Sequence, residues 1–183
     1  MNRQIDTFIK IILVLCLVLI CIFLAIKPKK VTAQTDTTEV EVVADLELKT
    51  YFNVPISQEL QDHIFVECKK HNILPAVIVA LIEKESVFDN YAIGDDGRAF
   101  GLMQVQPKWH LERMIELNCT DLFDPFKNIT VGVNYLSELL NRYDGNIEKA
   151  LTAYNRGSFN GKITNYAKEI LKRADNFEVI NNG

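Results

Sequence analysis

Cysteine and histidine are scarce in this chain. Its 183 residues include only four cysteines and three histidines. Cys68 and Cys119 have no CxxC partner, and His63, His71 and His110 share no ligand spacing, so no metal site is expected. In an oxidising compartment a disulfide between Cys68 and Cys119 is an alternative, but two unpaired thiols are the favoured interpretation.

The chain also lacks a cluster of basic residues outside its N-terminus. Residues 1–30 carry five basic and one acidic side chain, and the whole chain has a formal charge of −4, so residues 31–183 carry −8. Proteins that bind nucleic acids need clustered Lys and Arg against the phosphates. Nucleic acid is therefore not an expected partner. No internal repeat is apparent either.

An apolar run without charged residues marks the N-terminus. Residues 11–26 read IILVLCLVLICIFLAI, which is short for a transmembrane helix of roughly 20 apolar residues. Residues 31–33 (Val-Thr-Ala) resemble a cleavage site, but Lys27, Lys29 and Lys30 before them are typical of a retained segment. We therefore expect a transmembrane anchor or signal segment over residues 1–30, with the anchor favoured. Basic residues flank both sides of the run, so charge alone does not give its orientation.

The next segment is acidic and has a composition unlike that of a folded domain. Residues 31–50 are rich in Thr, Asp and Glu and contain neither glycine nor aromatic residues. Mutual repulsion of the acidic side chains favours an extended linker, which we assign to residues 31–52. Residues 53–183 are then expected to form one folded domain.

The hydrophobic pattern of residues 53–183 is mostly helical. Ser57 is expected to cap a helix that ends near residues 69–70, with an apolar stripe of Leu60, Ile64, Val66 and Cys68. Pro75 suits the first turn of a buried helix that continues to Glu85, although residues 76–82 alone would suggest a strand. Helical stripes follow over residues 129–140 and 147–154, and a last helix over 163–173. The predicted fold class is mainly α.

Three short motifs carry the chemistry. Glu85-Ser86 ends the most apolar predicted helix, Gly101-Leu102-Met103-Gln104 follows in a loop, and Tyr154-Asn155 comes later. Cleavage of a glycosidic bond needs a proton on the leaving oxygen, and a carboxylic acid in an apolar, partly dry setting can supply it. Gly101 is expected to allow a tight turn and Leu102 to pack inward.

In this order and spacing the motifs resemble the soluble lytic transglycosylase (SLT) domain of the lysozyme-like superfamily, which is related to goose lysozyme and cuts peptidoglycan. The resemblance runs from about Pro55 to Leu171. It implies a single lysozyme-like helical domain behind the N-terminal membrane segment. It also implies that Glu85 is the catalytic acid and base.

The same resemblance implies the substrate-binding residues. Met103 and Gln104 would face the groove, with the Gln104 amide offered to an N-acetyl group. The hydroxyl of Tyr154 would lie near the catalytic carboxyl. The remaining substrate-binding residues are Ser86, Asn155 and Tyr166, of which Tyr166 is the weakest match. Local hydrogen bonding of Ser86 and ordinary core packing of Met103 and Tyr154 stay open as alternatives.

The activity implied is that of a lytic transglycosylase, which cleaves the β-1,4 bond between N-acetylmuramic acid and N-acetylglucosamine and leaves a 1,6-anhydro end. No metal or organic cofactor is required. The implied partners are peptidoglycan glycan strands, the membrane through residues 1–30 and, as an open question, a wall-spanning secretion or conjugation apparatus. The expected location is the bacterial cell membrane, with a single span and the catalytic domain outside the cytoplasm, or secretion after cleavage.

Two alternatives to this activity remain. A hydrolytic muramidase on the same fold would need Asp89, Asp95 or Asp96 to assist a water molecule. The loop over residues 93–98 lacks the serine that often precedes its glycine in the family, and Asp95-Asp96-Gly97 is more typical of a turn. The second alternative is a non-catalytic wall-binding component of a secretion or conjugation apparatus.

Overall fold

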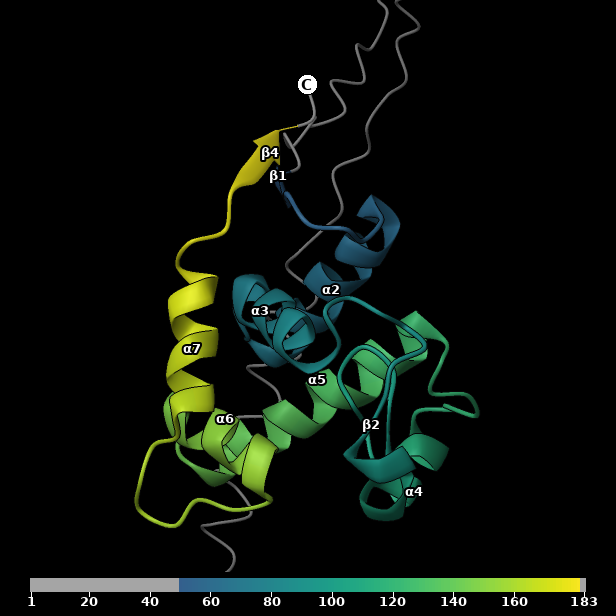
Figure 1. Ribbon diagram of the computed structural model, residues 1–183, viewed down its shortest axis with the longest axis vertical. Helices are drawn as coiled ribbons and strands as arrows, with labels where there is room; N and C mark the ends of the chain where they lie inside the picture. Colours follow the sequence, from purple (N-terminus) through teal and green to yellow (C-terminus); the bar gives the residue numbers. More distant parts are fainter. Residues whose placement is uncertain (1–49, 182–183) are drawn as a thin grey trace, which may run out of the picture. The chain divides into compact units, whose positions relative to one another are not determined.

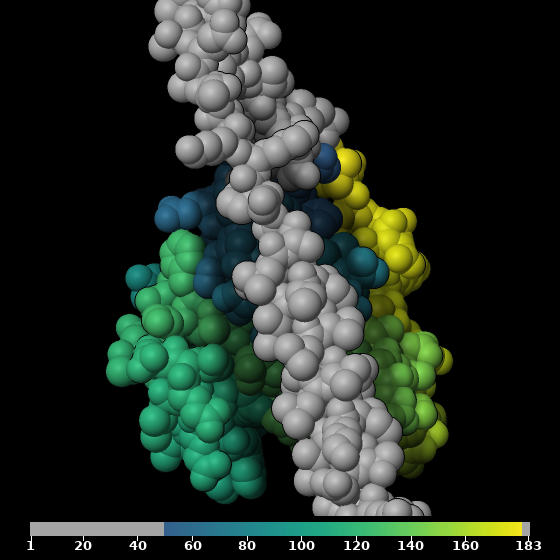
Figure 2. All heavy atoms as spheres, turned by 180° about the vertical axis from the view of Figure 1, so that it is seen from behind, coloured from purple at the N-terminus to yellow at the C-terminus, as the bar shows by residue number. Residues whose placement is uncertain are grey.

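The computed structural model of the protein describes residues 50–181. The expected membrane segment over residues 1–30, and the linker up to residue 49, lie outside the described residues. Thr50–Phe52, which we had assigned to the linker, instead forms strand β1 of the folded domain. It pairs antiparallel with β4 (Val179–Asn181), and the Tyr51 side chain is buried. Figure 2 shows these C-terminal residues beside the first residues of the described domain.

Six α-helices make up most of residues 50–181, so the predicted mainly α fold class is confirmed (Figure 1). None of these helices is both long enough and apolar enough to cross a membrane. Their bounds are α2 (Gln58–His71), α3 (Pro75–Ser86), α4 (Pro107–Glu116), α5 (Pro125–Arg142), α6 (Ile147–Arg156) and α7 (Asn165–Ala174). Helix α4 was not predicted from the sequence, and none of its residues is buried.

Helix α2 begins and ends close to the predicted positions. The Ser57 hydroxyl accepts a hydrogen bond from the Leu60 amide at 3.2 Å, as expected of the N-cap. Leu60, Ile64 and Cys68 are buried, but the prediction for Val66 is wrong, since 52% of it is exposed. Two residues along a helix turn through about 200°, so Val66 points away from the side that Ile64 buries.

Helix α3 is the centre of the hydrophobic core. Pro75 occupies its first turn, and every residue from Val77 to Ile82 is buried. The β-branched run is thus a buried helix, as predicted, and it packs against α2 and α7. In Figure 1 it lies between α2 and α7. The helix ends directly after the Glu85-Ser86 motif, where Val87 and Phe88 both adopt left-handed backbone angles (φ 51° and 66°). Non-glycine residues in this region carry strain of order 1–3 kcal/mol each.

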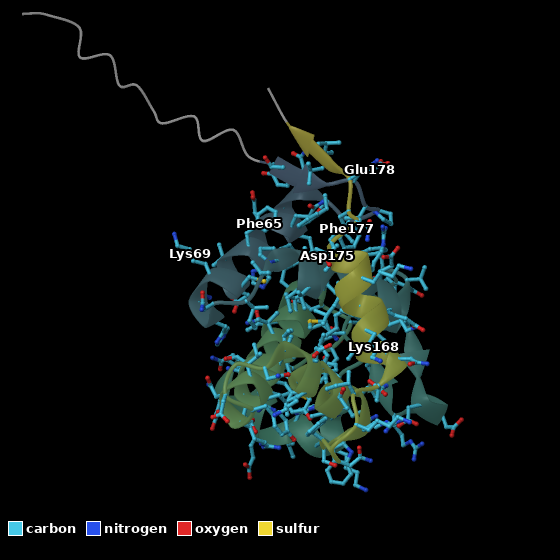
Figure 3. All side chains as sticks on the ribbon, turned by 90° about the vertical axis from the view of Figure 1, so that its left-hand side faces the viewer. Phe65, Lys69, Lys168, Asp175, Phe177 and Glu178 are labelled. Atoms are coloured by element: carbon cyan, nitrogen blue, oxygen red, sulfur yellow. The ribbon has the colours of Figure 1, made fainter. Side chains whose placement is uncertain are left out.

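Helix α7 packs along α3 and α6 and is fixed to α3 by ion pairs. Arg173 Nε donates to Glu83 at 2.5 Å, and Lys84 donates to Glu169 at 2.6 Å. Beyond the helix, the Phe177 ring packs against Phe52 with ring centroids 5.4 Å apart. Figure 3 shows Phe177 on the segment that joins α7 to β4. These contacts set the position of α7, which carries Tyr166, relative to the end of α3, which carries Glu85.

A short loop unit joins α3 to α4. Strands β2 (Ile93–Gly94) and β3 (Ala99–Phe100) pair antiparallel around the 3₁₀ turn η1 (Asp95–Gly97). Phe100 also pairs with Val105 across the Gly101–Gln104 turn. Two-residue strands carry too little alternation to be predicted from a sequence pattern.

Candidate active site

Glu85 lies in the last turn of α3 with a partly buried side chain. Burial raises the pKa of its carboxyl above the usual range, while a hydrogen bond from Tyr166 and the charge of Lys84 lower it by less. The net shift favours the protonated form. A carboxyl in this state is suited to donate a proton to a poor leaving group.

The direct partner of Glu85 is Tyr166, in the first turn of α7. Its hydroxyl donates a hydrogen bond to Oε1 of Glu85. Burial, and then the charge of Glu85, raise the pKa of Tyr166 far above its usual value, so the phenol stays a donor at any working pH. The weakest of the sequence matches is therefore the residue in closest contact with the carboxyl.

Tyr154 lies nearby but does not bond to the carboxyl. Its hydroxyl donates to the Met103 carbonyl oxygen at 2.9 Å. Burial first, and then the charge of Glu85, raise the pKa of Tyr154 well above its usual value. Tyr154 thus joins α6 to the backbone of the Gly101–Gln104 turn.

The Gly101–Gln104 turn is built where two backbone segments approach closely. Gly101 has φ +72°, and a Cβ at this position would lie 2.3 Å from the Leu122 carbonyl oxygen. Only glycine fits such a site. Leu102 is fully buried, as expected. The prediction that Met103 faces the groove is wrong: its side chain is fully buried against Gly132 of α5, which leaves room because it has no side chain.

Gln104 is the member of this turn that lies at the cavity. Its Nε2 donates to the carbonyl oxygens of Gly101 at 3.0 Å and Ala92 at 3.2 Å. The amide is therefore held in one orientation by the turn itself. Its backbone is left-handed (φ 48°), an uncommon conformation for a residue other than glycine.

Asn128, in the first turn of α5, was not found by sequence reasoning. It is fully buried, and its Nδ2 donates to the carbonyl oxygens of Phe100 (2.8 Å) and Leu122 (2.9 Å). Its Oδ1 accepts from the Met103 amide at 2.8 Å. One amide side chain thus fixes both ends of the turn. The available signal was a polar residue one turn before Gly132 on the inward side of the helix.

Two cavities adjoin at the end of α6. The first has a volume of about 620 Å³, and Gln104, Tyr154 and Asn155 are among its lining residues. The second, of about 420 Å³, is lined by Asn155, Arg156 and residues 162–166, including Tyr166. Asn155 and Arg156 line both cavities. Glu85 is not a lining residue of either cavity, but it is hydrogen-bonded to Tyr166, which lines the second cavity.

Ser86 has a local role in the structure. Its hydroxyl is buried and donates to the Ile82 carbonyl oxygen at 3.1 Å, one turn back along α3. This is the hydrogen bond that the sequence left open as an alternative. The bond lies within the last turn of α3, the helix end that carries Glu85.

The aspartates considered as a second catalytic carboxylate are occupied elsewhere. Asp95 accepts from Arg98 at 2.7 Å and from Gln106 at 2.9 Å, and Asp96 has a side chain that is 97% exposed. Asp89 accepts from the Tyr91 amide in a local turn.

A polar cluster that was not predicted from the sequence also lines the first cavity. Arg113 donates to Nδ1 of His110 at 2.7 Å and forms an ion pair with Glu138. Burial, and then the charge of Arg113, lower the pKa of His110 to about 4. His110 is therefore neutral near pH 7. Its ring packs against Tyr135 in a tilted arrangement (55° between the ring planes), and the Tyr135 ring in turn contacts Tyr154 at 5.2 Å between centroids.

The described domain shows no arrangement of three or more His, Cys, Asp or Glu side chains that could hold a metal ion. Cys68 and Cys119 are both buried and free, in agreement with the favoured interpretation of two thiols.

Two curated relatives are similar to part of the chain. The membrane-bound lytic murein transglycosylase C of Yersinia enterocolitica is 34% identical over 105 residues, covering 49% of this chain and 29% of that protein. The protein of the same name from Serratia proteamaculans is 33% identical over 105 residues, with the same coverage. The chain thus spans less than a third of the length of these relatives.

Solved structures show the same fold. A structure of an inactive mutant of the lytic transglycosylase Slt from Pseudomonas aeruginosa aligns with a TM-score of 0.56 and 23% identity, over 66% of this chain and 24% of that chain. The 70 kDa soluble lytic transglycosylase from Escherichia coli aligns with a TM-score of 0.50 and 22% identity, over 65% and 19%. These likenesses agree with the lysozyme-like helical domain expected from the sequence.

Residues 62–176 match the family described as "Transglycosylase SLT domain". This match covers more than half of the chain and includes all three motifs that carry the chemistry. The chain therefore belongs to the transglycosylase SLT domain family.

Proposed function

We propose that the protein is a peptidoglycan lytic transglycosylase that uses Glu85 as its single catalytic carboxyl. The observation that carries the proposal is the state of Glu85: partly buried, with a raised pKa, and hydrogen-bonded by Tyr166 at the edge of two adjoining cavities. Membership of the SLT family and the names of the curated relatives support the same activity.

In the first step, protonated Glu85 gives its proton to the glycosidic oxygen between N-acetylmuramic acid and N-acetylglucosamine. The bond from this oxygen to the anomeric carbon breaks, and N-acetylglucosamine leaves with the proton. Positive charge then grows at the anomeric carbon. The Tyr166 hydroxyl stabilises the carboxylate that Glu85 has become.

In the second step, the Glu85 carboxylate takes a proton from the C6 hydroxyl of the muramoyl residue. The C6 oxygen attacks its own anomeric carbon and closes a 1,6-anhydro ring, so no water is consumed and Glu85 is protonated again. Because the attack is intramolecular, it gains from proximity and needs no second activated group. This fits a site in which Asp95 is bound to Arg98 and Gln106 and the side chain of Asp96 lies exposed to solvent.

The remaining site residues divide into two proposed roles. Gln104, Tyr154, Asn155 and Tyr166 lie at the cavities and are proposed to contact the glycan. Ser86 and Met103 are buried, so we propose that they act from beneath the site and hold Glu85 and the Gly101–Gln104 turn in place.

We further propose that residues 1–30 anchor the protein in the bacterial cell membrane, with the catalytic domain outside the cytoplasm. The apolar run over residues 11–26 and the membrane-bound relatives support this location. Peptidoglycan, the proposed substrate, lies on that side of the membrane. A wall-spanning apparatus is a compatible partner for such an anchored enzyme.

The test is mass spectrometry of muropeptides released from purified sacculi by the full chain in detergent. The matched variants are Glu85→Gln and Glu83→Gln, which remove one carboxylate each from the same helix; Glu83 pairs with Arg173 rather than Tyr166. The wild type and Glu83→Gln are expected to release anhydromuramoyl products, and Glu85→Gln none. Reducing ends would identify a hydrolytic muramidase instead. No release by the wild type would favour a wall-binding component.

A further inference from the structure

Arg156 stands out among the arginines of the described domain. It lies exposed in the last turn of α6 and lines both cavities. Within residues 50–181 it is the only arginine without an ion pair or hydrogen bond from its side chain. The others are paired with carboxylates: Arg98 with Asp95, Arg113 and Arg142 with Glu138, and Arg173 with Glu83.

Lys162 adds a second unpaired cation on the same wall. It lines the second cavity with Arg156 and likewise has no ion pair or hydrogen bond among the described residues. No carboxylate lines that cavity. Residues 31–183 carry a charge of −8, so acidic side chains are plentiful in this protein. Two free cations together in one hollow of an acidic protein point to an anionic ligand.

The position of the cavity indicates which anion this is. Tyr166, which touches Glu85, lines the second cavity together with Arg156 and Lys162. In peptidoglycan, the stem peptide is attached to the lactyl group of the muramoyl residue, the same sugar whose glycosidic bond is cleaved. The peptide must therefore leave the site close to Glu85. It carries free carboxylates, which the flat guanidinium of Arg156 can bind with two hydrogen bonds.

Building on the proposed function, we propose that Arg156 and Lys162 bind a carboxylate of the stem peptide, so that the protein prefers glycan with attached peptides to peptide-free glycan. Arg156 is the middle residue of Asn155-Arg156-Gly157. Gly157 ends α6 in a left-handed conformation (φ 78°), and its amide donates back to the Ala153 carbonyl oxygen. This cap holds Arg156 at the mouth of both cavities.

The experiment compares two substrates with the full chain in detergent. One is purified peptidoglycan with its stem peptides, and the other is the same material after removal of the peptides by an N-acetylmuramoyl-L-alanine amidase. The variants are Arg156→Gln, Lys162→Gln, the double variant and Arg156→Lys. Lys168→Gln is the matched control, because Lys168 is exposed on α7 (Figure 3) and lines neither cavity.

On the peptide-bearing substrate, Arg156→Gln is expected to lower kcat/KM about three- to tenfold, mainly through KM, and the double variant about tenfold or more. Arg156→Lys should recover part of this loss, and Lys168→Gln should behave as the wild type. On peptide-free glycan all variants should match the wild type within about twofold. Peptidoglycan with amidated peptide carboxylates should reduce the wild type to the rate of the double variant.

Two results would overturn the inference. An equal loss on both substrates would show that Arg156 acts on the glycan or the fold, and no loss on either substrate would show that no carboxylate is bound. The proposed function fails separately, if the wild type releases no anhydro product from either substrate. The peptide-free arm therefore distinguishes failure of the catalytic site from failure of the carboxylate site.

Discussion

The hydroxyl of Tyr166 donates a hydrogen bond to the carboxyl of Glu85, although 81 residues separate the two in the chain. The contact depends on the packing of α7 along α3, which ion pairs from Glu83 and Lys84 help to fix. Burial and this hydrogen bond act on the pKa of Glu85 in opposite directions, with burial the larger. The hydrogen bond from Tyr166 therefore limits how far burial raises the pKa of Glu85.

Tyr166→Phe is expected to raise the pKa of Glu85 further, because the change removes a hydrogen bond that stabilises the carboxylate. Proton donation requires protonated Glu85, so activity falls as pH rises through this pKa. The alkaline limb of the pH profile of kcat should therefore move to higher pH. A hydrogen bond to a charged group contributes about 1.5–3 kcal/mol, so the maximal kcat should fall about 10- to 100-fold.

Tyr154→Phe is the control, since the Tyr154 hydroxyl bonds to the Met103 carbonyl and not to Glu85. Its alkaline limb should stay near that of the wild type. If the alkaline limbs of the kcat profiles of Tyr166→Phe and the wild type coincide, the hydrogen bond does not lower the pKa of Glu85.

Glu85→Gln should lower cleavage by at least about 100-fold, as expected for loss of a general acid. The same variant should be more stable than the wild type at pH 7. The pKa of Glu85 is higher in the folded state, so its ionisation costs stability as pH rises above the unfolded pKa. Below that pKa both states are protonated and the cost disappears.

Melting temperatures at pH 7 and near pH 3.5 measure this difference. The gain in Tm for Glu85→Gln should be present at pH 7 and shrink at the lower pH. Glu83→Gln should not gain stability at pH 7, because it removes the surface ion pair with Arg173. A gain for Glu85→Gln of equal size at both pH values would contradict a raised pKa.

Much of the fold could be predicted because its signals are local. Pro75 and the apolar residues after it specify a buried helix within one segment, and Ser57 specifies the start of another. Val66 was misassigned because its hydrophobicity was read without its helical angle. Helix α4 and strands β2 and β3 escaped prediction because their pairing and position come from the tertiary fold.

The candidate site, like the fold, was predictable only where the signal is local in the sequence. Glu85 was predicted from its place at the end of an apolar helix together with the family motifs around it, and its partial burial and raised pKa agree with that prediction. The resemblance placed the Tyr154 hydroxyl near the Glu85 carboxyl, but the hydroxyl that bonds to it belongs to Tyr166. This partner depends on the packing of α7 along α3, and sequence spacing gives no such distance. The burial of Met103 follows from the absence of a side chain at Gly132, a relationship that only packing reveals.

The two thiols of the described domain should be unreactive in the native protein. Burial, and then the charge of Glu67, raise the pKa of Cys68 to about 12, and burial also raises the pKa of Cys119. The thiolate is the reactive form, so a maleimide at pH 7 should modify neither residue until urea unfolds the chain. Mass spectrometry of peptides containing each cysteine gives the extent of labelling. Rapid native labelling of Cys68 would contradict its burial.

Asn128→Ala tests whether one buried amide holds the Gly101–Gln104 turn. The substitution leaves the Leu122 carbonyl and the Met103 amide without their partner, whereas the Phe100 carbonyl keeps its hydrogen bond from the Val105 amide. Each unsatisfied group costs roughly 1–3 kcal/mol, so we expect the free energy of unfolding to fall by about 2–6 kcal/mol. Because the same turn carries Gln104, kcat/KM should fall as well.

Urea unfolding gives the stability change, and the matched control is Asn141→Ala. Asn141 lies on the same helix but is exposed, so its loss should alter stability by no more than about 0.5 kcal/mol.

Asn128→Asp tests the hydrogen bonds of the amide nitrogen apart from the hydrogen bond of the amide oxygen. It keeps an acceptor for the Met103 amide but loses both donors and sets a carboxylate against two carbonyl oxygens. If the donors hold the turn, Asn128→Asp should be at least as unstable as Asn128→Ala at pH 7. A stable Asn128→Asp protein with normal kcat/KM would show that the single bond to Met103 is sufficient.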